Sequence, residues 1–438
     1  MQVGILGVLR TAYSGRGKNS RALLNRMKNL MKIAHIEQIP IAMPLAARYD
    51  DHAGRMRMYD IDQHLVIKVH ADNGLVGYGD YEDNPNPVPQ TLVDSLIGKS
   101  PFNFLHNNFH MALGMALYDL MGKYLGEPAY KLMGQKVRDA VPCAAWTRPC
   151  PPDVFAAEIE RAAAQGYRIF KMHSDARYDV VEQTRAAEKV APPGFKLHWD
   201  LNHNRTLGTV LPIVAELEKS PLVGFIEDPL IWSDIDGWRT LREKVKVPLI
   251  MHVPQLGGIQ EVVHGVADIY MIGGGIGNTL ISGFAYGKAN IQCLIQQSGN
   301  TLMKALTLHQ AAVLPTASAH VLTLDDQFDG DFTRACIPVI EGFSQVPEGA
   351  GLGVEVDEEA LARAAARAHL PSCDFIGVLH LPGGHKAYTL GDPNVNRLTG
   401  TEEGSLSGLN YEYWVEDGSA DYARVLERLQ EEGPFIES

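Results

Sequence analysis

The feature that most constrains the fold is a regular alternation of short apolar runs with amphipathic stretches between Val141 and Leu324. The apolar runs have the length of buried strands and are Val141–Trp146, Tyr167–His173, Lys196–Leu201, Leu222–Glu227, Pro248–Val253, Ile269–Ile272, Ile291–Gln296 and His320–Leu324. The stretches between them include Val154–Gln165, Val180–Val190, Thr209–Glu218 and Ile235–Val245, which carry apolar residues at helical spacing. Eight strands that alternate with helices predict an α/β protein with a closed parallel (β/α)8, TIM-like barrel rather than an open doubly wound sheet.

Composition excludes several classes of protein. The 39 Lys and Arg residues against 52 Asp and Glu residues give a net charge of −13, which disfavours a nucleic-acid partner. No apolar run approaches the roughly 18 residues of a membrane-spanning helix, so we expect no membrane partner. The five cysteines are scattered and form no Cys-x-x-Cys pair, which favours a reducing compartment. We therefore expect a cytoplasmic protein.

The first 36 residues contain seven Lys or Arg residues and no acidic residue. This composition resembles that of an organellar transit peptide, so the basic N-terminus leaves organellar targeting open. The alternative is that an upstream start codon adds a dispensable extension. Residues 1–32 are accordingly assigned to a basic N-terminal extension.

The remaining chain divides around the barrel. Residues 64–80 alternate like two strands about the turn Asn73-Gly74, and residues 104–125 have helical spacing that ends at Gly126. These patterns predict an N-terminal α+β capping domain over residues 33–140, followed by the barrel over 141–340. Residues 341–373 are expected to return to the cap, and residues 374–438 to form a C-terminal appendage whose role the sequence does not indicate.

Polar side chains follow consecutive strands of the predicted barrel. Lys171 and His173 end one strand, Asp200 ends the next and Glu227 the one after that. The carboxyl ends of barrel strands meet at one mouth, where barrel enzymes carry their active sites. Two carboxylates on adjacent strands suit a hard divalent cation such as Mg²⁺. A single strand-end acid more often caps the following helix, but the pair beside a lysine and a histidine favours a metal site.

Several motifs together resemble the enolase superfamily, in particular its mandelate racemase/muconate lactonizing enzyme branch, over about residues 33–365. The motifs are Gly74–Asp80 (GLVGYGD), Ala116–Pro128 (ALYDLMGKYLGEP), Gly166–Lys171 (GYRIFK), Asp200–Asn202 (DLN), Glu227–Pro229 (EDP) and Val346–Gly353 (VPEGAGLG). The resemblance implies that a substrate carboxylate chelates a divalent metal, most simply Mg²⁺ with Mn²⁺ as the alternative. A base then removes the neighbouring proton to give an enediolate. It also implies that Asp200 and Glu227 are metal ligands and that Lys171 is the first lysine of the family's Lys-x-Lys motif.

Three positions depart from the family pattern. His173 stands where the second lysine is expected, and we predict that it is the catalytic base, with a substrate-binding or structural role as the alternative. The third metal ligand is normally a carboxylate, but Val253 occupies that position. His252 is therefore predicted as the third ligand, which would shift the preference toward Mn²⁺, Fe²⁺ or Zn²⁺. The opposite-face histidine is absent, and Gln296–Ser298 end that strand instead.

Further residues near the predicted mouth are candidates for substrate binding, namely Asn202, Tyr49, Arg55, Gln297 and Asp326. Tyr49 and Arg55 belong to the capping-domain loop that, in the family resembled, closes over the barrel and sets specificity. Asp326 follows the eighth strand, where an acidic loop is more often simply solvated. His309 lies inside the helical stretch Leu306–Leu314 and is expected to be packed rather than catalytic.

These residues predict abstraction of the proton α to a carboxylate, most simply in the dehydration of a sugar acid or a related hydroxy-carboxylate. Dehydration can use one base that later delivers its proton to the leaving hydroxyl group. A racemase or epimerase of a hydroxy acid or amino acid derivative is the alternative, and it requires a second base. A catalytically inactive, ligand-binding barrel is a third hypothesis, because the third carboxylate is missing. We expect a small-molecule carboxylate as substrate and a homo-oligomer.

Overall fold

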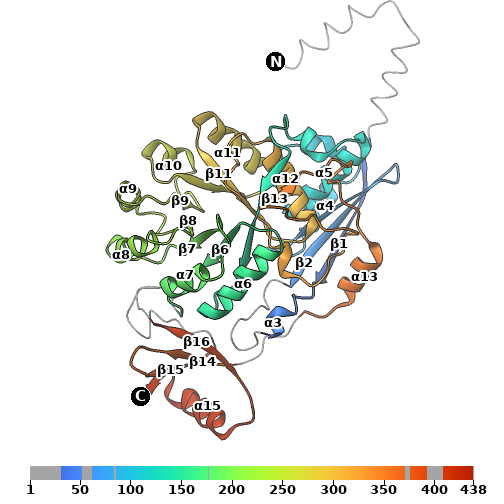
Figure 1. The fold of residues 1–438 in the computed structure, drawn as a ribbon. Helices are drawn as coiled ribbons and strands as arrows, with labels where there is room; N and C mark the ends of the chain where they lie inside the picture. The colour runs from blue at the N-terminus through green and yellow to red at the C-terminus, as the bar shows by residue number, and fades with distance from the viewer. Residues whose placement is uncertain are drawn as a thin grey trace, which may run out of the picture.

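The computed structural model describes residues 31–51, 62–82, 85–175, 177–369, 375–391 and 408–437 (Figure 1). The predicted N-terminal extension up to residue 30, and the candidate Arg55, lie outside the described residues. Within the described ranges, no helix combines the length and the apolar character needed to cross a membrane.

Eight parallel strands form the predicted barrel (Figure 1). They are paired in chain order and are β5 Ala144–Thr147, β6 Ile169–His173, β7 Lys196–Asp200, β8 Val223–Glu227, β9 Leu249–Met251, β10 Ile269–Ile272, β11 Gln292–Gln296 and β12 Val321–Leu322. A parallel bridge between Cys143 and Val321 brings the first and last strands together. The prediction of a (β/α)8 barrel is confirmed.

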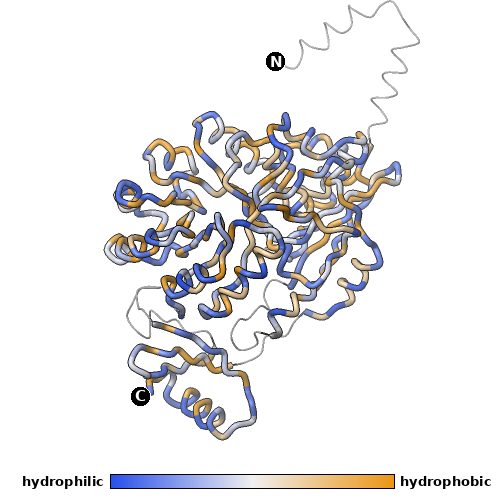
Figure 2. Tube along the Cα trace, viewed as in Figure 1, coloured by the Kyte–Doolittle hydropathy of each residue, from blue (hydrophilic) through white to orange (hydrophobic). Residues whose placement is uncertain are grey.

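Helices surround the barrel strands. They are α6 Pro152–Ala164, α7 Val180–Glu188, α8 Leu207–Leu217, α9 Ile235–Lys244, α10 Ile259–His264, α11 Ile276–Ala289 and α12 Thr301–Val313. Hydrophobic residues concentrate along the strands, and the surrounding helices alternate between hydrophobic and hydrophilic segments (Figure 2). This pattern is what a helix needs when one face packs on a sheet and the other faces water.

The first predicted barrel strand is divided in the structure. Only Ala144–Thr147 joins the barrel, whereas β4 (Ala140–Pro142) pairs antiparallel with β13 (Phe343–Gln345). The prediction of one strand over Val141–Trp146 was therefore wrong in its first part. An apolar run shows that a segment is buried but does not show which partner strand it meets.

The N-terminal sheet consists of β1 (Ile33–Ala42), β2 (Gln63–Ala71) and β3 (Val76–Tyr81), all antiparallel, and includes the predicted hairpin. Its face packs on α5 (Met111–Leu125). The approach is so close that a Cβ at Gly77 or Gly79 would lie 2.1 or 1.9 Å from a carbonyl oxygen of α5. Glycine at these two positions is thus required by the packing of the sheet against the helix. The short helices α3 (Arg48–Asp51) and α4 (Gln90–Leu96) flank this sheet.

The helix predicted over residues 104–125 begins only at Met111. Pro101–Phe104 forms a separate 3-10 turn, and the Asn107 side chain donates to Phe104 O and accepts from Phe109 N. These side-chain hydrogen bonds replace helical ones, so apolar residues at helical spacing here do not make a helix. The predicted end is correct, because Gly126 adopts the left-handed conformation with φ of 69°.

The C-terminal residues form a separate antiparallel sheet after α13 (Glu358–Ala366). Its strands lie in the order β16-β14-β15-β17, and the elements are β14 Phe375–His380, β15 Lys386–Leu390, β16 Asn410–Val415, α15 Ala420–Glu432 and β17 Phe435–Glu437. Helix α15 covers one face of the sheet through Tyr422, Val425 and Leu429. We call residues 375–391 and 408–437 the C-terminal unit; it lies beside α7 at the edge of the barrel (Figure 1).

Candidate active site

The predicted polar residues converge at one mouth of the barrel. Lys171 and His173 lie two residues apart on β6 and therefore point to the same face of the strand. Asp200 ends β7 and Glu227 ends β8, next to them in the sheet. His173, Asp200 and Glu227 are the last residues of their strands, as the sequence predicted, and Lys171 lies two residues before the end of β6.

Lys171 is the fully buried centre of this cluster. Its Nζ lies 2.9 Å from Glu227 Oε2, 3.1 Å from Asp200 Oδ2 and 2.9 Å from Gln296 Oε1. Burial alone would lower the pKa of Lys171, but the two neighbouring carboxylates raise it above its ordinary value. Lys171 is therefore a permanent cation in the floor of the mouth.

His173 is the more accessible member of the pair on β6, with 31% of its side chain exposed. Its Nε2 lies 3.1 Å from Asp200 Oδ2, and its ring meets the edge of Trp146 with 5.8 Å between ring centroids. Burial would raise the pKa of Asp200, but Lys171 and His173 hold it well below its usual range. The carboxylate of Asp200 thus orients the imidazole, which faces the open side of the mouth.

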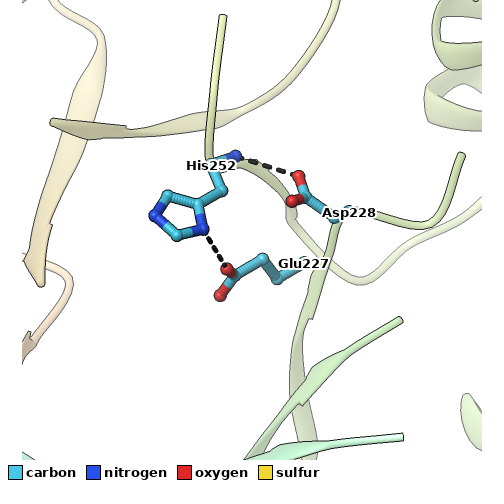
Figure 3. Close-up of side chains that lie close together, drawn as sticks. All are labelled: Glu227, Asp228 and His252. Carbon is cyan, nitrogen blue, oxygen red and sulfur yellow. Dashed lines mark hydrogen bonds and ion pairs between the residues drawn. The ribbon is translucent and has the colours of Figure 1, made fainter. Parts of the chain in front are cut away.

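A second group of donors lies at the end of β8 and just beyond β8 and β9 (Figure 3). His252 Nδ1 is 3.4 Å from Glu227 Oε1, and the His252 backbone N–H donates to Asp228 Oδ1 at 2.9 Å. One ligand atom from each of Glu227, Asp228 and His252 lies within 4.8 Å of the other two. Val253, at the position where the family carries a carboxylate, is 40% exposed, and His252 is the residue that reaches the cluster.

The donor set fits a divalent cation. Burial, followed by the charges of Glu227 and Asp200, raises the pKa of Asp228 to about 8, and burial and Asp200 also raise that of Glu227. Asp200 and Glu227 share Lys171 and Asp228 adds a third carboxyl group beside them, so a further positive charge would relieve their repulsion. Oxygen donors with one imidazole suit Mn²⁺, Fe²⁺ or Zn²⁺ as well as Mg²⁺.

Two buried histidines beneath the cluster were not predicted. His198 Nε2 lies 2.6 Å from Glu227 Oε2, and His198 Nδ1 lies 2.9 Å from His320 Nε2. Burial lowers the pKa of both imidazoles well below the usual range, so both are neutral. His198 could have been found in the sequence, because it stands two residues before Asp200 on the same face of its strand.

The predicted substrate-binding residues have partners of their own. Asn202 has φ of 53°. Its backbone N–H donates to Asp200 Oδ1 and its side-chain amide donates to Ser174 O, so it connects the loops that follow β7 and β6. Gln297 is buried, and its Oε1 accepts from Thr307 at 2.9 Å. Their assignment to substrate binding stays a prediction.

Tyr49 and Asp326 lie together at the contact between the cap and the barrel. The Arg48 guanidinium donates to Tyr49 Oη at 3.1 Å and lies 3.8 Å from Asp326 Oδ2, while Arg161 lies 3.0 Å from the same oxygen. Both candidate side chains are nearly buried in this ion network. The contacts describe an anchor for α3 on the barrel, and substrate binding by either residue also stays a prediction.

The opposite face of the mouth carries amides. Strand β11 ends at Gln296, which contacts Lys171 as described above. His309 is fully buried in α12, where its Nε2 lies 3.1 Å from Leu352 O, and burial lowers its pKa to about 4. The expectation that His309 is packed is confirmed. Among the described residues, β11 therefore offers no histidine at its carboxyl end.

Comparison with known proteins agrees with this architecture. Residues 154–360 match the family described as enolase C-terminal domain-like. The chain is 24% identical over 369 residues to an N-succinyl-L-Arg/Lys racemase of Bacillus cereus, covering 76% of this chain and 97% of the relative. It is 25% identical over 344 residues to a D-gluconate dehydratase of Thermoproteus tenax, covering 68% of this chain and 69% of that one.

Solved structures share the fold. An enolase from Mycobacterium smegmatis complexed with tartrate superposes with a TM-score of 0.64 at 21% identity, covering 77% of this chain and 92% of its own. An enolase from Thermobispora bispora complexed with magnesium and formate gives a TM-score of 0.64 at 21% identity, covering 77% and 93%.

Fold and site together define a barrel enzyme with an N-terminal cap and charged residues at the carboxyl ends of three consecutive strands. Residues 154–360 match the enolase C-terminal domain-like family, and the chain is similar to members of the enolase superfamily at low identity. Relative to the pattern that this resemblance implies, the chain carries histidine at the second Lys-x-Lys position and at the third ligand strand. The relatives are dehydratases and a racemase, which confirms the prediction of a lyase or isomerase of this superfamily.

Proposed function

We propose that this protein is a metal-dependent lyase that dehydrates a sugar acid or a related small hydroxy-carboxylate. The observation that carries the proposal is the asymmetry of the mouth. On one face, the accessible His173 lies against Asp200, whereas the other face ends in Gln296. One proton carrier is enough for a dehydration, in which the same group removes the α-proton and protonates the leaving hydroxyl group.

The metal would be held by Asp200 and Glu227, with His252 as the third ligand; Asp228 is the next nearest donor. When bound, a divalent cation supplies charge stabilisation for the negative charge that develops on the substrate carboxylate. We propose Mg²⁺ or Mn²⁺, and the imidazole of His252 favours the softer of the two.

The chain's own residues account for the proton transfers. The Nε2–H of His173 donates to Asp200 in the neutral tautomer, which leaves Nδ1 as the proton acceptor. Nδ1 takes the α-proton, and the electron pair of the C–H bond passes into an enediolate. The enediolate expels the β-hydroxyl group, which receives the proton from His173 and leaves as water. Lys171 stays charged throughout and stabilises the carboxylate end of the substrate.

The test combines metal analysis with solvent exchange. The protein is incubated with Mn²⁺ in D₂O with D-gluconate and, separately, with D-galactonate, and deuterium at the α-carbon and formation of the 2-keto acid are followed by NMR. We expect product from at least one acid sugar and none after the metal is removed by a chelator. Exchange without dehydration, accompanied by inversion at the α-carbon, would instead identify a racemase or epimerase.

The racemase alternative has one observation in its favour, which is the Bacillus cereus racemase that matches over 97% of its length. A metal-binding protein that exchanges no α-proton in any acid sugar would support the ligand-binding barrel. The cytoplasmic location and the homo-oligomeric state stay predictions, to be measured by fractionation and by sedimentation.

A further inference from the structure

The loop that follows His173 contacts the C-terminal unit as well as the barrel. The loop 174–179 joins β6 to α7, and the structure describes its residues 174, 175 and 177–179. Tyr178 is fully buried there and forms one hydrophobic cluster with Phe375, Leu379, Ala387, Tyr411 and Tyr413. Among the described residues, Tyr178 is the one member of this cluster that does not come from the C-terminal unit.

Arg177 makes the second connection. Its guanidinium lies 5.0 Å from the ring centroid of Tyr411 and 5.9 Å from that of Tyr413, and its Nη1 donates to Tyr413 Oη at 3.1 Å. The same guanidinium holds Asp175 in a two-pronged contact, with Nε 2.7 Å and Nη2 2.5 Å from its carboxylate oxygens. Because the guanidinium is planar and rigid, it fixes the loop and the two tyrosine rings in one arrangement.

Asp179 makes the third connection at the far end of the loop. Its Oδ1 caps α7 by accepting from Val181 N at 2.9 Å, while its Oδ2 accepts from Gly408 N at 3.0 Å. At the near end, Ser174 N donates to Asp200 O and Ser174 O accepts from the Asn202 amide, both at 2.7 Å. The barrel therefore holds the first residue of the loop, and the C-terminal unit holds the last three.

The C-terminal unit lies beyond the family match, which ends at residue 360. An isomerase from Streptomyces coelicolor A3(2) gives a TM-score of 0.62 at 21% identity, and the match covers 97% of that chain but only 77% of this one. Residues 1–32 and 374–438 together are 97 of the 438 residues, which is close to the share left over. The unit is therefore outside the residues that match the family, and its contacts with the loop after His173 need a separate reason.

We propose that the C-terminal unit holds the loop 174–179, and through it His173, in the arrangement that the active site requires. We call this set of contacts between the unit and the loop the brace. Arg177 and Tyr178 are positioning residues in this account, since the contacts described above join them to Asp175 and to the C-terminal unit. The brace as a structural element stands on the contacts alone, whereas its effect on turnover rests on the proposed function.

The test compares Arg177→Ala with Arg185→Ala in the full-length protein. Arg185 lies on α7, is 54% exposed and pairs only with the surface acids Glu182 and Glu216 in the described structure, so it controls for the loss of one positive charge. Hydrogen–deuterium exchange of backbone amides is followed by mass spectrometry. We expect exchange in peptides covering residues 174–180 to become at least about tenfold faster in Arg177→Ala and to stay at the wild-type rate in Arg185→Ala.

The effect on the site is measured as turnover of D-gluconate, or of D-galactonate if only that acid sugar reacts. We expect kcat of Arg177→Ala to fall at least about tenfold with KM little changed, because the loop orients the base and does not bind substrate. Tyr413→Phe keeps the ring beneath the guanidinium and removes one hydrogen bond, so its kcat should lie between those of the wild type and Arg177→Ala.

Two results would overturn the proposal. If the loop of Arg177→Ala exchanges at the wild-type rate, the C-terminal unit does not brace it. If the loop exchanges faster but kcat is unchanged, the brace does not position His173. A wild-type protein that transforms neither acid sugar would count against the proposed function, while the exchange comparison would still decide whether the loop is braced.

Discussion

His173 Nε2 lies 3.1 Å from Asp200 Oδ2, so the residue proposed as the base and a residue proposed as a metal ligand share one hydrogen bond. The contact fixes the tautomer of His173, because an ionised carboxylate only accepts. It also places the free Nδ1 on the side of the ring away from Asp200. In the proposed function, one carboxylate would thus orient the proton acceptor and also serve as a ligand of the cation, so the two roles are coupled by geometry.

The first prediction concerns His173. His173→Asn keeps an amide that can donate to Asp200 but removes the proton acceptor. We expect kcat to fall by about 10²-fold or more with KM little changed, since general-base catalysis typically contributes about 10²–10⁴. Exchange of the substrate α-proton with D₂O should stop as well. If KM rises and exchange persists at saturation, His173 binds substrate, and Lys171 becomes the candidate base.

The second prediction concerns the metal ligands. Asp200→Asn and Glu227→Gln keep the shape of the side chains and remove one negative charge each. We expect each variant to lose Mn²⁺ binding in a titration followed by electron paramagnetic resonance. The far-UV circular dichroism spectrum should stay unchanged, because neither residue contributes apolar packing. Wild-type affinity in both variants would show that the cation binds elsewhere.

The third prediction is a pH dependence of stability that comes from His309. Burial lowers its pKa to about 4 in the folded state, against about 6.5 in the unfolded chain. The unfolded state therefore binds the proton more tightly, so this stability is fully present above pH 6.5 and is lost as the pH falls toward 4. The loss attributable to His309 should reach about 2 kcal/mol at pH 5.

The measurement is urea unfolding of the wild type and His309→Gln at pH 7.5 and pH 5. Glutamine retains an amide N–H that can donate to Leu352 O but does not titrate. We expect the wild type to lose more unfolding free energy than the variant between the two pH values. Equal losses would show that His309 is already protonated in the folded protein or is exposed.

Periodicity predicted the barrel because parallel strands buried on both faces leave unmistakable apolar runs. The hairpin about Asn73-Gly74 was predicted for a similar reason, since turn chemistry is local. The start of α5 was missed because the side chain of Asn107 takes over hydrogen bonds that a helix would make. Side-chain competition of that kind is invisible in the spacing of apolar residues.

Part of the active site could be predicted from the sequence for the same reason. Lys171, His173, Asp200 and Glu227 sit at strand ends, and strand ends in a parallel barrel must meet. The position of His198 two residues before Asp200 indicates that both side chains lie on the same face of the strand. Its contact with Glu227 depends on the register of the two adjacent strands, which the spacing does not indicate. The insertion of Tyr178 into the C-terminal unit joins segments some 200 residues apart, and no local pattern indicates such a pairing.

The last prediction distinguishes the contribution of Lys171 to stability from that of a bound metal ion. Lys171→Met leaves Asp200 and Glu227 buried without their shared cation, so the free energy of unfolding should fall by about 3–5 kcal/mol. In the proposed function Mn²⁺ binds the same oxygens, so it should restore much of the loss, because a ligand that binds only the folded state stabilises it by mass action.

The matched control is Lys304→Met. Lys304 is also buried and lies 2.8 Å from Asp325, a carboxylate outside the cluster of Glu227, Asp228 and His252. Its loss should destabilise the protein similarly, but Mn²⁺ should raise the Tm of Lys304→Met no more than it raises that of the wild type. Mn²⁺ should raise the Tm of Lys171→Met more than it raises that of the wild type or of Lys304→Met, because the lysine ammonium no longer competes for the carboxylate oxygens. An equal rise in Tm for the wild type and both variants would show that the cation binds away from Lys171. The carboxylates around that lysine would then only neutralise its charge.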